Sequence, residues 1–399
     1  MRVTQSFEQS QFLATIDSLQ STIAQNQNQV SSGLAFTEPS QDPAAAGAVS
    51  GLDQALSQSQ QYTSNANSAQ TSLQTENTAL TQIQNQLQSL SSLALEANSG
   101  TESSQNLTAI AAQATQIQNT LLSLANTQDG NGNYIFAGFA AQTQPFALTA
   151  TGASYAGDQG QPQVQIAAGQ SVATGDSGSA VFNEIKTGNG TFTVTPAAGN
   201  TGTGVVGANT VADPSAVTGT DYTIDFATPT SYQVLNPNNT VVASGTYAAG
   251  QTLAFGGLQV TLSGQPAAGD KFNVAPSTNQ SIFTTVQNLV TALQGGTGTP
   301  AQQTQLSNAV AAALGNIDQA ITHTSTIEAD VGGRLNAVTT QLSVATSQQT
   351  QLQKSVSALQ GLNYASAITT LDSENTQLSA AFQAYTITQG LSLFKYIGS

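Results

Sequence analysis

The chain has 399 residues, enough for two or three domains at roughly 150 residues per domain. Lys and Arg number 6 and Asp and Glu 21, so the formal net charge is −15, although charged residues make up only 7% of the chain. So few cations cannot follow a nucleic-acid backbone. Because cysteine is absent and His323 is the single histidine, disulfides, thiolate or His-rich metal sites and cysteine nucleophiles are excluded.

Targeting signals are weak. No apolar run approaches the roughly 18 residues of a membrane-spanning helix. The first residues, MRVTQSFEQSQFLATIDSL, lack the apolar stretch of a secretory signal. These features fit a cytoplasmic chain or export by a route without a cleaved signal peptide.

Composition divides the chain into three parts. Residues 1–133 and 281–399 are rich in Gln, Ser, Ala and Leu, whereas residues 134–280 are rich in Gly, Thr and Val. The ends follow helical patterns and the middle follows strand patterns. We predict an α+β fold: an elongated helical bundle of heptad-patterned N- and C-terminal helices, with an inserted β-rich domain of one or two subdomains.

The N-terminal part begins with an apolar seam that steps by four and three residues, as in a coiled coil. Ser31-Ser32-Gly33 interrupts the pattern, and Asp42-Pro43 is a typical helix start. The next helix is predicted over about 43–98, and would be on the order of 80 Å long. A third is predicted over about 107–124. The first seam contains Phe12, Ile16, Leu19, Ile23, Asn26 and Val30.

The C-terminal part resumes the helical pattern after a predicted capping box, Thr299-Pro300-Ala301-Gln302. Gly332-Gly333 is expected to kink or break this helix, and Gly361 marks a second weak point. A last amphipathic segment runs from Tyr364 to Tyr385. The seams are thin and include polar residues. We therefore expect the terminal helices to be only marginally stable alone and to be stabilised by packing against partner helices.

Short alternating runs in the middle part predict strands at 191–195, 222–226, 240–244 and 258–262. Asn189-Gly190 predicts a hairpin before the first of them. The run YIFAGF at 134–139 is predicted to be a strand that follows a turn at residues 129–133.

Candidate chemistry is sparse. His323 lies on a helical stretch without a distinctive partner and is predicted to be a solvated or groove-facing side chain. Asp129, Asn131 and Asn133 resemble the start of a calcium loop, but the later ligand positions do not match, which favours a plain turn. Acidic pairs lack the aromatic platforms of glycosidases. We predict a non-enzymatic protein with no cofactor and no metal.

Particular strings resemble bacterial flagellar axial proteins. They are SSGLAFTEPSQDPAAAGAVSGL at 31–52, SLANTQDGNGNYIFAGF at 123–139 and LSLFKYI at 391–397. The PSQDP and NGNYIFAG forms, with the strings at 155–172 and 266–277, are more similar to the hook–filament junction family of hook-associated proteins than to flagellin.

The resemblance implies a structural subunit of the flagellum. Such a subunit binds the first hook-associated protein on the hook side and flagellin on the filament side. It would self-associate in a ring of about eleven copies, with an export chaperone before assembly. It would be extracellular after export through the flagellar type III apparatus, without a cleaved signal peptide.

The predicted assembly interface consists of apolar side chains on the terminal helices and in the first loop. A charge at Ile16 or Phe382 is expected to block assembly while leaving the β domain folded. In the first loop Leu34-Ala35-Phe36 replaces basic residues usual in the family, so packing by Phe36 is expected there. The full set is Phe12, Ile16, Leu19, Ile23, Phe36, Leu378, Phe382, Leu391 and Phe394.

Two alternatives remain open at this point. A flagellin filament subunit would share the terminal helices and differ in the PSQDP loop and in copy number. A surface adhesin would bind a glycan or a host protein through residues 134–280, although the chain contains no Trp to form a sugar platform.

Overall fold

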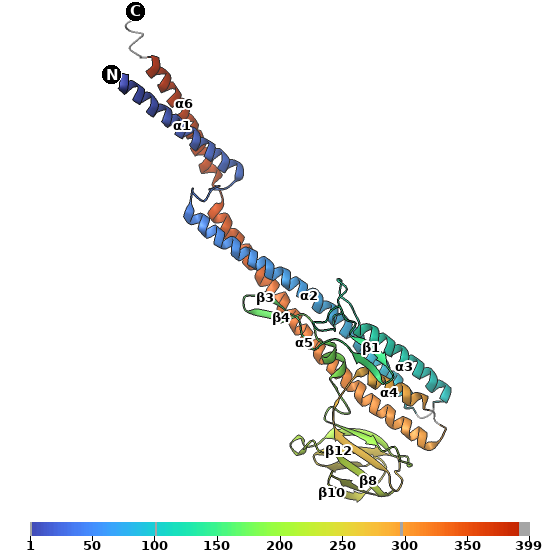
Figure 1. The fold of residues 1–399 in the computed structure, drawn as a ribbon. Helices are drawn as coiled ribbons and strands as arrows, with labels where there is room; N and C mark the ends of the chain where they lie inside the picture. The colour runs from blue at the N-terminus through green and yellow to red at the C-terminus, as the bar shows by residue number, and fades with distance from the viewer. Residues whose placement is uncertain (1, 100–101, 296–297, 391–399) are drawn as a thin grey trace, which may run out of the picture. The chain divides into compact units, whose positions relative to one another are not determined.

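A computed structural model describes residues 2–99, 102–295 and 298–390 (Figure 1). The chain forms two compact units. Unit 1 combines Met1–Ser64 with Leu342–Ser399, and unit 2 is Asn65–Gln341. The predicted class, terminal helices around a central β-rich region, is confirmed.

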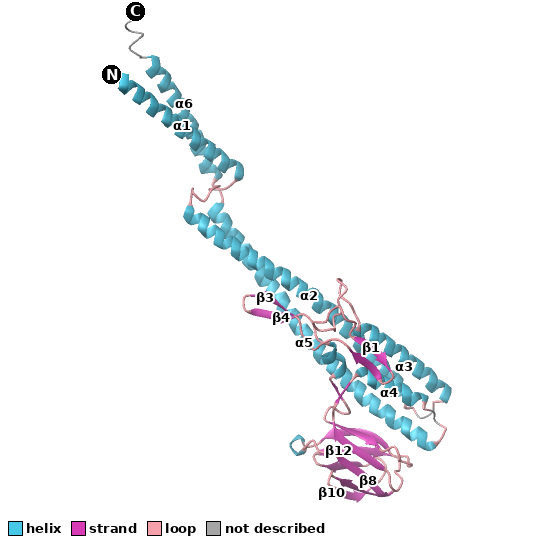
Figure 2. Cartoon of the chain, viewed as in Figure 1, coloured by secondary structure: helices cyan, strands magenta, loops and turns pink. Residues whose placement is uncertain are grey.

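The described residues contain six α-helices (Figure 2). α2 and α5 are 55 and 61 residues long and contribute to both units. None of the described helices combines the length and apolarity needed to cross a bilayer. The helices are α1 (Arg2–Ser32), α2 (Pro43–Ala97), α3 (Ser104–Ala125), α4 (Ile282–Gln294), α5 (Pro300–Gln360) and α6 (Tyr364–Gly390).

The predicted helix starts are confirmed. The Asp42 carboxylate accepts the Ala45 N–H at 2.9 Å at the start of α2. At the start of α5 the Thr299 N–H donates to Gln302 Oε1 at 3.0 Å, and the Gln302 N–H donates to Thr299 Oγ1 at 3.2 Å. This reciprocal pair is a capping box, which satisfies two backbone donors that have no partner within the helix.

The predicted helix interruptions are only partly right. Gly33, at φ +74°, follows the end of α1, and Gly361 separates α5 from α6. The prediction of a helix break at Gly332-Gly333 is wrong, because α5 continues through both residues. A glycine inside a helix costs only about 1 kcal/mol, which the packing of a long helix offsets.

The β region contains one two-sheet domain and three short ribbons. We use "β domain" for residues 192–276, which pair a five-stranded sheet, in the order β10-β9-β8-β13-β6, with a three-stranded sheet, β11-β12-β7. Its strands are β6 (Phe192–Pro196), β7 (Val205–Val211), β8 (Tyr222–Thr228), β9 (Ser231–Leu235), β10 (Val241–Thr246), β11 (Thr252–Phe255), β12 (Leu258–Ser263) and β13 (Lys271–Pro276). The ribbons are β1 (Phe146–Thr149) with β2 (Gly152–Tyr155), β3 (Gln163–Ala167) with β4 (Gln170–Ala173), and β5 (Ile185–Lys186) with β14 (Asn279–Gln280).

Two strand predictions are corrected. Residues 134–139 form turns instead of a strand, with Gly138 at φ +69° and Phe136 fully buried. Gly190 does close a turn onto Thr187, but no hairpin follows, because β5 pairs with β14 and β6 pairs with β13. The turn therefore changes the direction of the chain between two different sheets.

The helical part of unit 2 has an apolar core of its own. Aromatic rings from the β1–β2 ribbon, a short π-helix η1 (Ser179–Asn183) and α4 meet there, with ring centroids 5.1–5.9 Å apart. These contacts join the ribbon to the helices without involving the β domain. The rings are those of Phe146, Phe182 and Phe283.

Candidate assembly interface

α1 and α6 form an antiparallel pair in unit 1 that is held by a thin seam. The rings of Phe12 and Tyr385 stack with centroids 5.4 Å apart. Nearer the other end of the pair, Asn26 Nδ2 donates to Glu374 Oε2 at 2.6 Å, and Glu374 is only 9% exposed. A polar pair in such a seam favours one register over its neighbours. Among the α1 side chains from residue 7 onward, the buried apolar ones are Ile16 and Ile23.

The same pair leaves large apolar side chains in water. Six of them among the described side chains of α1 and α6 are between 45% and 65% exposed. Isolated exposed apolar residues are common, but several on one thin helix pair are typical of helices that further helices cover. They are Phe7, Leu13, Tyr364, Ile368, Phe382 and Ile387.

The predicted interface residues fall into four groups. Ile16, Ile23 and Phe36 are buried within unit 1. Phe12, Leu19 and Leu378 are half-buried, and Phe382 is exposed. Leu391 and Phe394 lie outside the described residues. The chain therefore brings part of the set together internally and leaves Phe382 open to a partner.

Sequence reasoning missed Phe7, Leu13 and Ile387, because it followed one seam only. Each is an apolar residue outside the chosen four-and-three step, on a helix that is otherwise mostly polar. That off-seam set is the sequence signal by which these exposed residues could have been found.

The loop after α1 packs onto the junction between α5 and α6. Leu34 pairs with Gly361 in a β-bridge, and the Ala35 N–H donates to the Gln360 carbonyl at 2.7 Å. Phe36 then packs inside unit 1. These contacts connect the first and last parts of the chain.

A buried charged cluster joins three segments of unit 2. Glu76 on α2 is 1% exposed, and its Oε1 accepts the backbone N–H of Asp176 at 3.0 Å. The Asp176 carboxylate pairs with Arg334 on α5 and accepts from Gln161 Nε2 at 2.7 Å. Burial, together with the nearby Asp176 carboxylate, raises the pKa of Glu76 to about 8. Glu76 is therefore predominantly protonated at neutral pH, and the cluster is close to electroneutral.

One signal of this cluster is visible in the sequence, because Glu76 stands at the helical spacing of the apolar residues Leu73, Leu80 and Ile83 of α2. Its partners could not be found the same way, since Asp176 and Arg334 lie 158 residues apart.

The remaining candidate residues have structural roles. His323 Nε2 lies 2.7 Å from the Ala180 carbonyl, and since a carbonyl only accepts, the ring must carry its proton on Nε2. His323 thus joins α5 to η1 and is half-buried, which agrees with the groove-facing alternative of the prediction and not with the solvated one. The Asp129 carboxylate accepts the Asn131 and Asn133 N–H groups, which confirms the plain turn. No cluster of three or more His, Cys, Asp or Glu suited to a metal ion occurs among the described residues.

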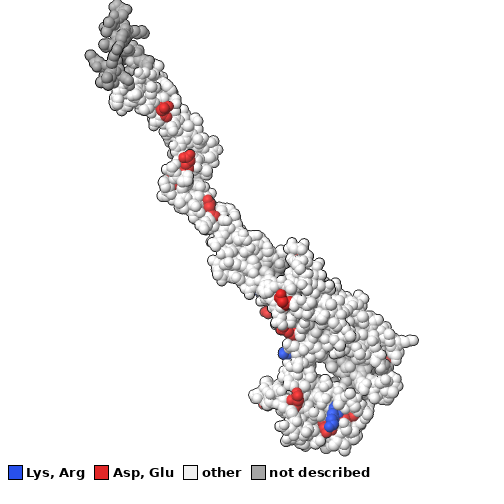
Figure 3. Space-filling view, in the orientation of Figure 1, with Lys and Arg blue, Asp and Glu red and all other residues white. Residues whose placement is uncertain are grey.

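Charge contributes little to the visible surface. Figure 3 shows acidic and basic side chains only as a few small patches on a largely uncharged face. Most of this face therefore offers uncharged side chains for contact.

Comparison with known families gives three matches along the chain. The model of the bacterial flagellin N-terminal helical region matches residues 3–141, and that of the C-terminal helical region matches residues 314–397. The D2-like domain of flagellar hook-associated protein 1 matches residues 195–276, within the β domain.

Individual relatives extend these matches. The chain is 31% identical over 185 residues to the flagellar hook-associated protein 3 of Salmonella typhimurium, which covers 46% of this chain and 58% of that protein. The crystal structure of FlgL from Xanthomonas campestris superposes with a TM-score of 0.72 at 31% identity, over 77% of this chain and 99% of that one. Flagellar hook associated protein-3 from Legionella pneumophila gives 0.72 at 28% identity, over 77% and 97%.

Proposed function

We propose a function for this chain on the premise that it belongs to the FlgL family, that of flagellar hook-associated protein 3. The function is that of a structural, non-enzymatic subunit that joins the flagellar hook to the flagellin filament. Its neighbours are the first hook-associated protein on the hook side, flagellin on the filament side, and copies of itself in a ring of about eleven. An export chaperone binds it before assembly, and it reaches the cell exterior without a cleaved signal peptide.

The exposed apolar set on α1 and α6 supports this proposal most strongly. The helix pair buries only a thin seam of its own and leaves Phe7, Leu13 and Phe382 in water. Other helices that cover such a pair stabilise it by about 25 cal/mol for each Å² of apolar surface that they remove from water. A subunit of a helical assembly supplies those helices through its neighbours.

The interface residues take two roles in this proposal. Ile16, Ile23 and the Asn26–Glu374 contact hold α1 against α6 in one register. Phe382 and the other exposed apolar residues contact helices of neighbouring subunits, together with Leu391 and Phe394. Residues 1–133 and 281–399 form the two halves of the assembling helical part, and residues 134–280 are the outward-facing insertion.

The substitution Phe382→Glu tests this assignment without disturbing a buried residue. A carboxylate at an apolar helix contact loses its water without gaining a partner, so cells that carry the variant should make hooks without filaments. Unpolymerised flagellin should appear in the culture medium. The measurement is electron microscopy of the cells with a gel of the medium.

The matched control is Gln383→Glu, which adds the same charge one residue along α6 at an exposed polar position. It should leave filaments normal. Normal filaments on cells with the Phe382→Glu subunit would refute the assigned contact.

A further inference from the structure

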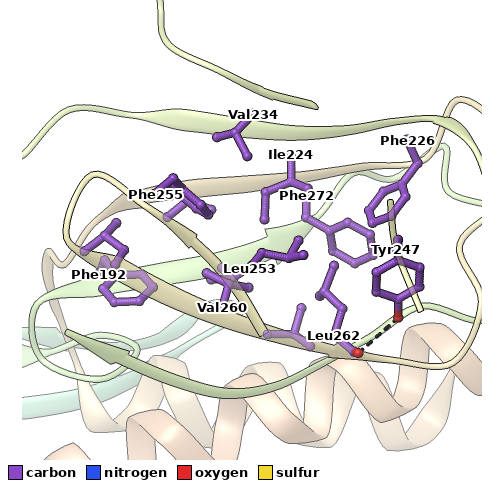
Figure 4. Close-up of a cluster of buried hydrophobic side chains, with 14 residues drawn as sticks. Phe192, Ile224, Phe226, Val234, Tyr247, Leu253, Phe255, Val260, Leu262 and Phe272 are labelled. Carbon is purple, nitrogen blue, oxygen red and sulfur yellow. Dashed lines mark hydrogen bonds between the residues drawn. The ribbon is translucent and has the colours of Figure 1, made fainter. Parts of the chain in front are cut away.

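The β domain fills an apolar core with its own strands. Fourteen buried side chains between Phe192 and Val274 form one cluster, part of which is labelled in Figure 4. The Tyr247 hydroxyl, the polar group of this core, donates to the Leu262 carbonyl at 3.0 Å. A domain with a complete core does not need to pack on the helices in order to fold.

A narrow neck joins the β domain to the rest of unit 2. It consists of the β5–β14 ribbon and the residues between this ribbon and the β domain. There the Thr187 N–H donates to the Thr278 carbonyl at 3.0 Å. Just beyond the ribbon, Gly188 and Gly190 have φ values of +65° and +87°. Glycine adopts this left-handed region without strain, so the chain has a point at which its direction can change.

Side-chain amides of α5 hold the β domain in its present orientation. Asn308 is 5% exposed; its Oδ1 accepts the Val206 N–H at 2.9 Å, and its Nδ2 donates to the Gly204 carbonyl at 3.0 Å. Asn316 Oδ1 accepts the Gly188 N–H at 2.8 Å. Val206 lies on β7, an outer strand of its sheet. Asn308 therefore supplies the hydrogen bonds that a neighbouring strand would otherwise provide.

A cleft of about 620 Å³ separates β6 and β7 from α5. Gly315 of α5 faces the neck closely, since a Cβ added there would lie 3.2 Å from the Gly188 carbonyl oxygen. The cleft walls carry mainly amide, hydroxyl and small side chains, so opening or closing the cleft exchanges polar contacts with water. Its amide side chains include Asn189, Asn209, Asn288, Asn308, Asn316 and Gln319.

We propose that the β domain is a hinged module that turns about Gly188 and Gly190, and that Asn308 and Asn316 hold it against α5 in the orientation seen here. The cleft is the space that this motion closes or enlarges. In an assembly, contacts with neighbouring subunits then set the orientation of the β domain, because they compete only with a few amide hydrogen bonds.

Distance measurement between two spin labels tests the hinge. The chain has no native cysteine, so Ser244→Cys on β10 and Ala329→Cys on α5, both exposed, place the labels uniquely in the full-length protein. With Asn308→Ala and Asn316→Ala added, the distance distribution should broaden, and the displaced population should rise about tenfold. Hydrogen exchange at the Val206 amide should accelerate, while exchange at Leu262 in the β core stays unchanged.

Asn288→Ala is the matched control, because Asn288 lines the cleft but its side chain makes no hydrogen bond within the described residues. It should keep the parent distribution. The single variant Asn316→Ala, at a half-buried residue away from the β core, should broaden it partially. An unchanged distribution in the double variant would overturn the proposal. Exchange that accelerates equally at Val206 and Leu262 would overturn it too, because the β domain would then be unfolding instead of turning.

Discussion

The α1–α6 pair and the β domain differ in how completely they bury their large apolar side chains. The β domain places Phe226 and Phe272 at 0% exposure inside a core that its own strands complete. The α1–α6 pair buries Ile16 and Ile23 but leaves Phe7 and Ile387 each 65% exposed.

We propose that this difference separates a region that folds for itself from one that partner helices complete. A closed core makes the β domain independent of its surroundings, and the stabilisation from burial stays inside one chain. An open helix pair retains unburied apolar surface, which in our proposal drives assembly. The two regions should therefore respond differently to truncation of a side chain.

The largest effect is expected from Phe272→Ala in the β domain. Phe272 is fully buried and contacts Phe226 with ring centroids 5.9 Å apart. Its loss should lower the free energy of unfolding of the β domain by about 3–5 kcal/mol. Denaturant titration of the full chain, followed by hydrogen exchange in the β domain, measures this. The control Val242→Ala, at a residue 46% exposed on β10, should change the stability by less than about 0.5 kcal/mol.

Helix positions could be predicted from the sequence because their signals are local. The Asp42 cap and the Thr299–Gln302 box each act within four residues, and the heptad step defines the buried face from neighbouring turns. Interruptions were less predictable: Gly361 breaks the helix and Gly332 does not, since packing along the helix decides whether a glycine is tolerated.

Strand pairing and long-range polar contacts could not be predicted in the same way. The turn at Asn189-Gly190 is present, but the partner of β6 is β13, about 80 residues later in the chain. The seam residues of the predicted interface followed from the helical periodicity. The exposed residues Phe7 and Leu13 could not be found in this way, because they lie outside that seam.

A second prediction concerns the dependence of stability on pH in unit 2. The pKa of Glu76 is raised from 4.5 to about 8 by burial and by Asp176. Between these values the folded chain keeps a proton that the unfolded chain releases, so stability should fall as the pH rises from 4.5 to 8. The expected change is on the order of 2 kcal/mol.

The substitution Glu76→Gln should remove this slope, because the amide stays neutral at every pH. Thermal unfolding between pH 5 and about 8.5 measures it in both proteins. Glu96→Gln, at an exposed acid on the same helix, is the control and should keep the parent slope. The same slope in the Glu76→Gln protein would show that another group binds the proton.

The smallest effect is expected from Ile16→Ala in the α1–α6 pair. Although Ile16 is only 6% exposed, it lies between two helices, α1 and α6, whose mostly exposed side chains can move toward the gap. The loss should be about 1–2 kcal/mol, below that of Phe272→Ala. Faster hydrogen exchange confined to α1 and α6 should report it. A loss as large as that in the β core would contradict the contrast between the two regions.

Deletion of the gene tests the junction role most directly, with electron microscopy of the cells and a gel of the culture medium. The account predicts hooks without filaments and unpolymerised flagellin in the medium, both reversed by the parent gene. Hooks without filaments and without any flagellin would instead identify this chain as the filament subunit. Unaltered filaments would contradict the account.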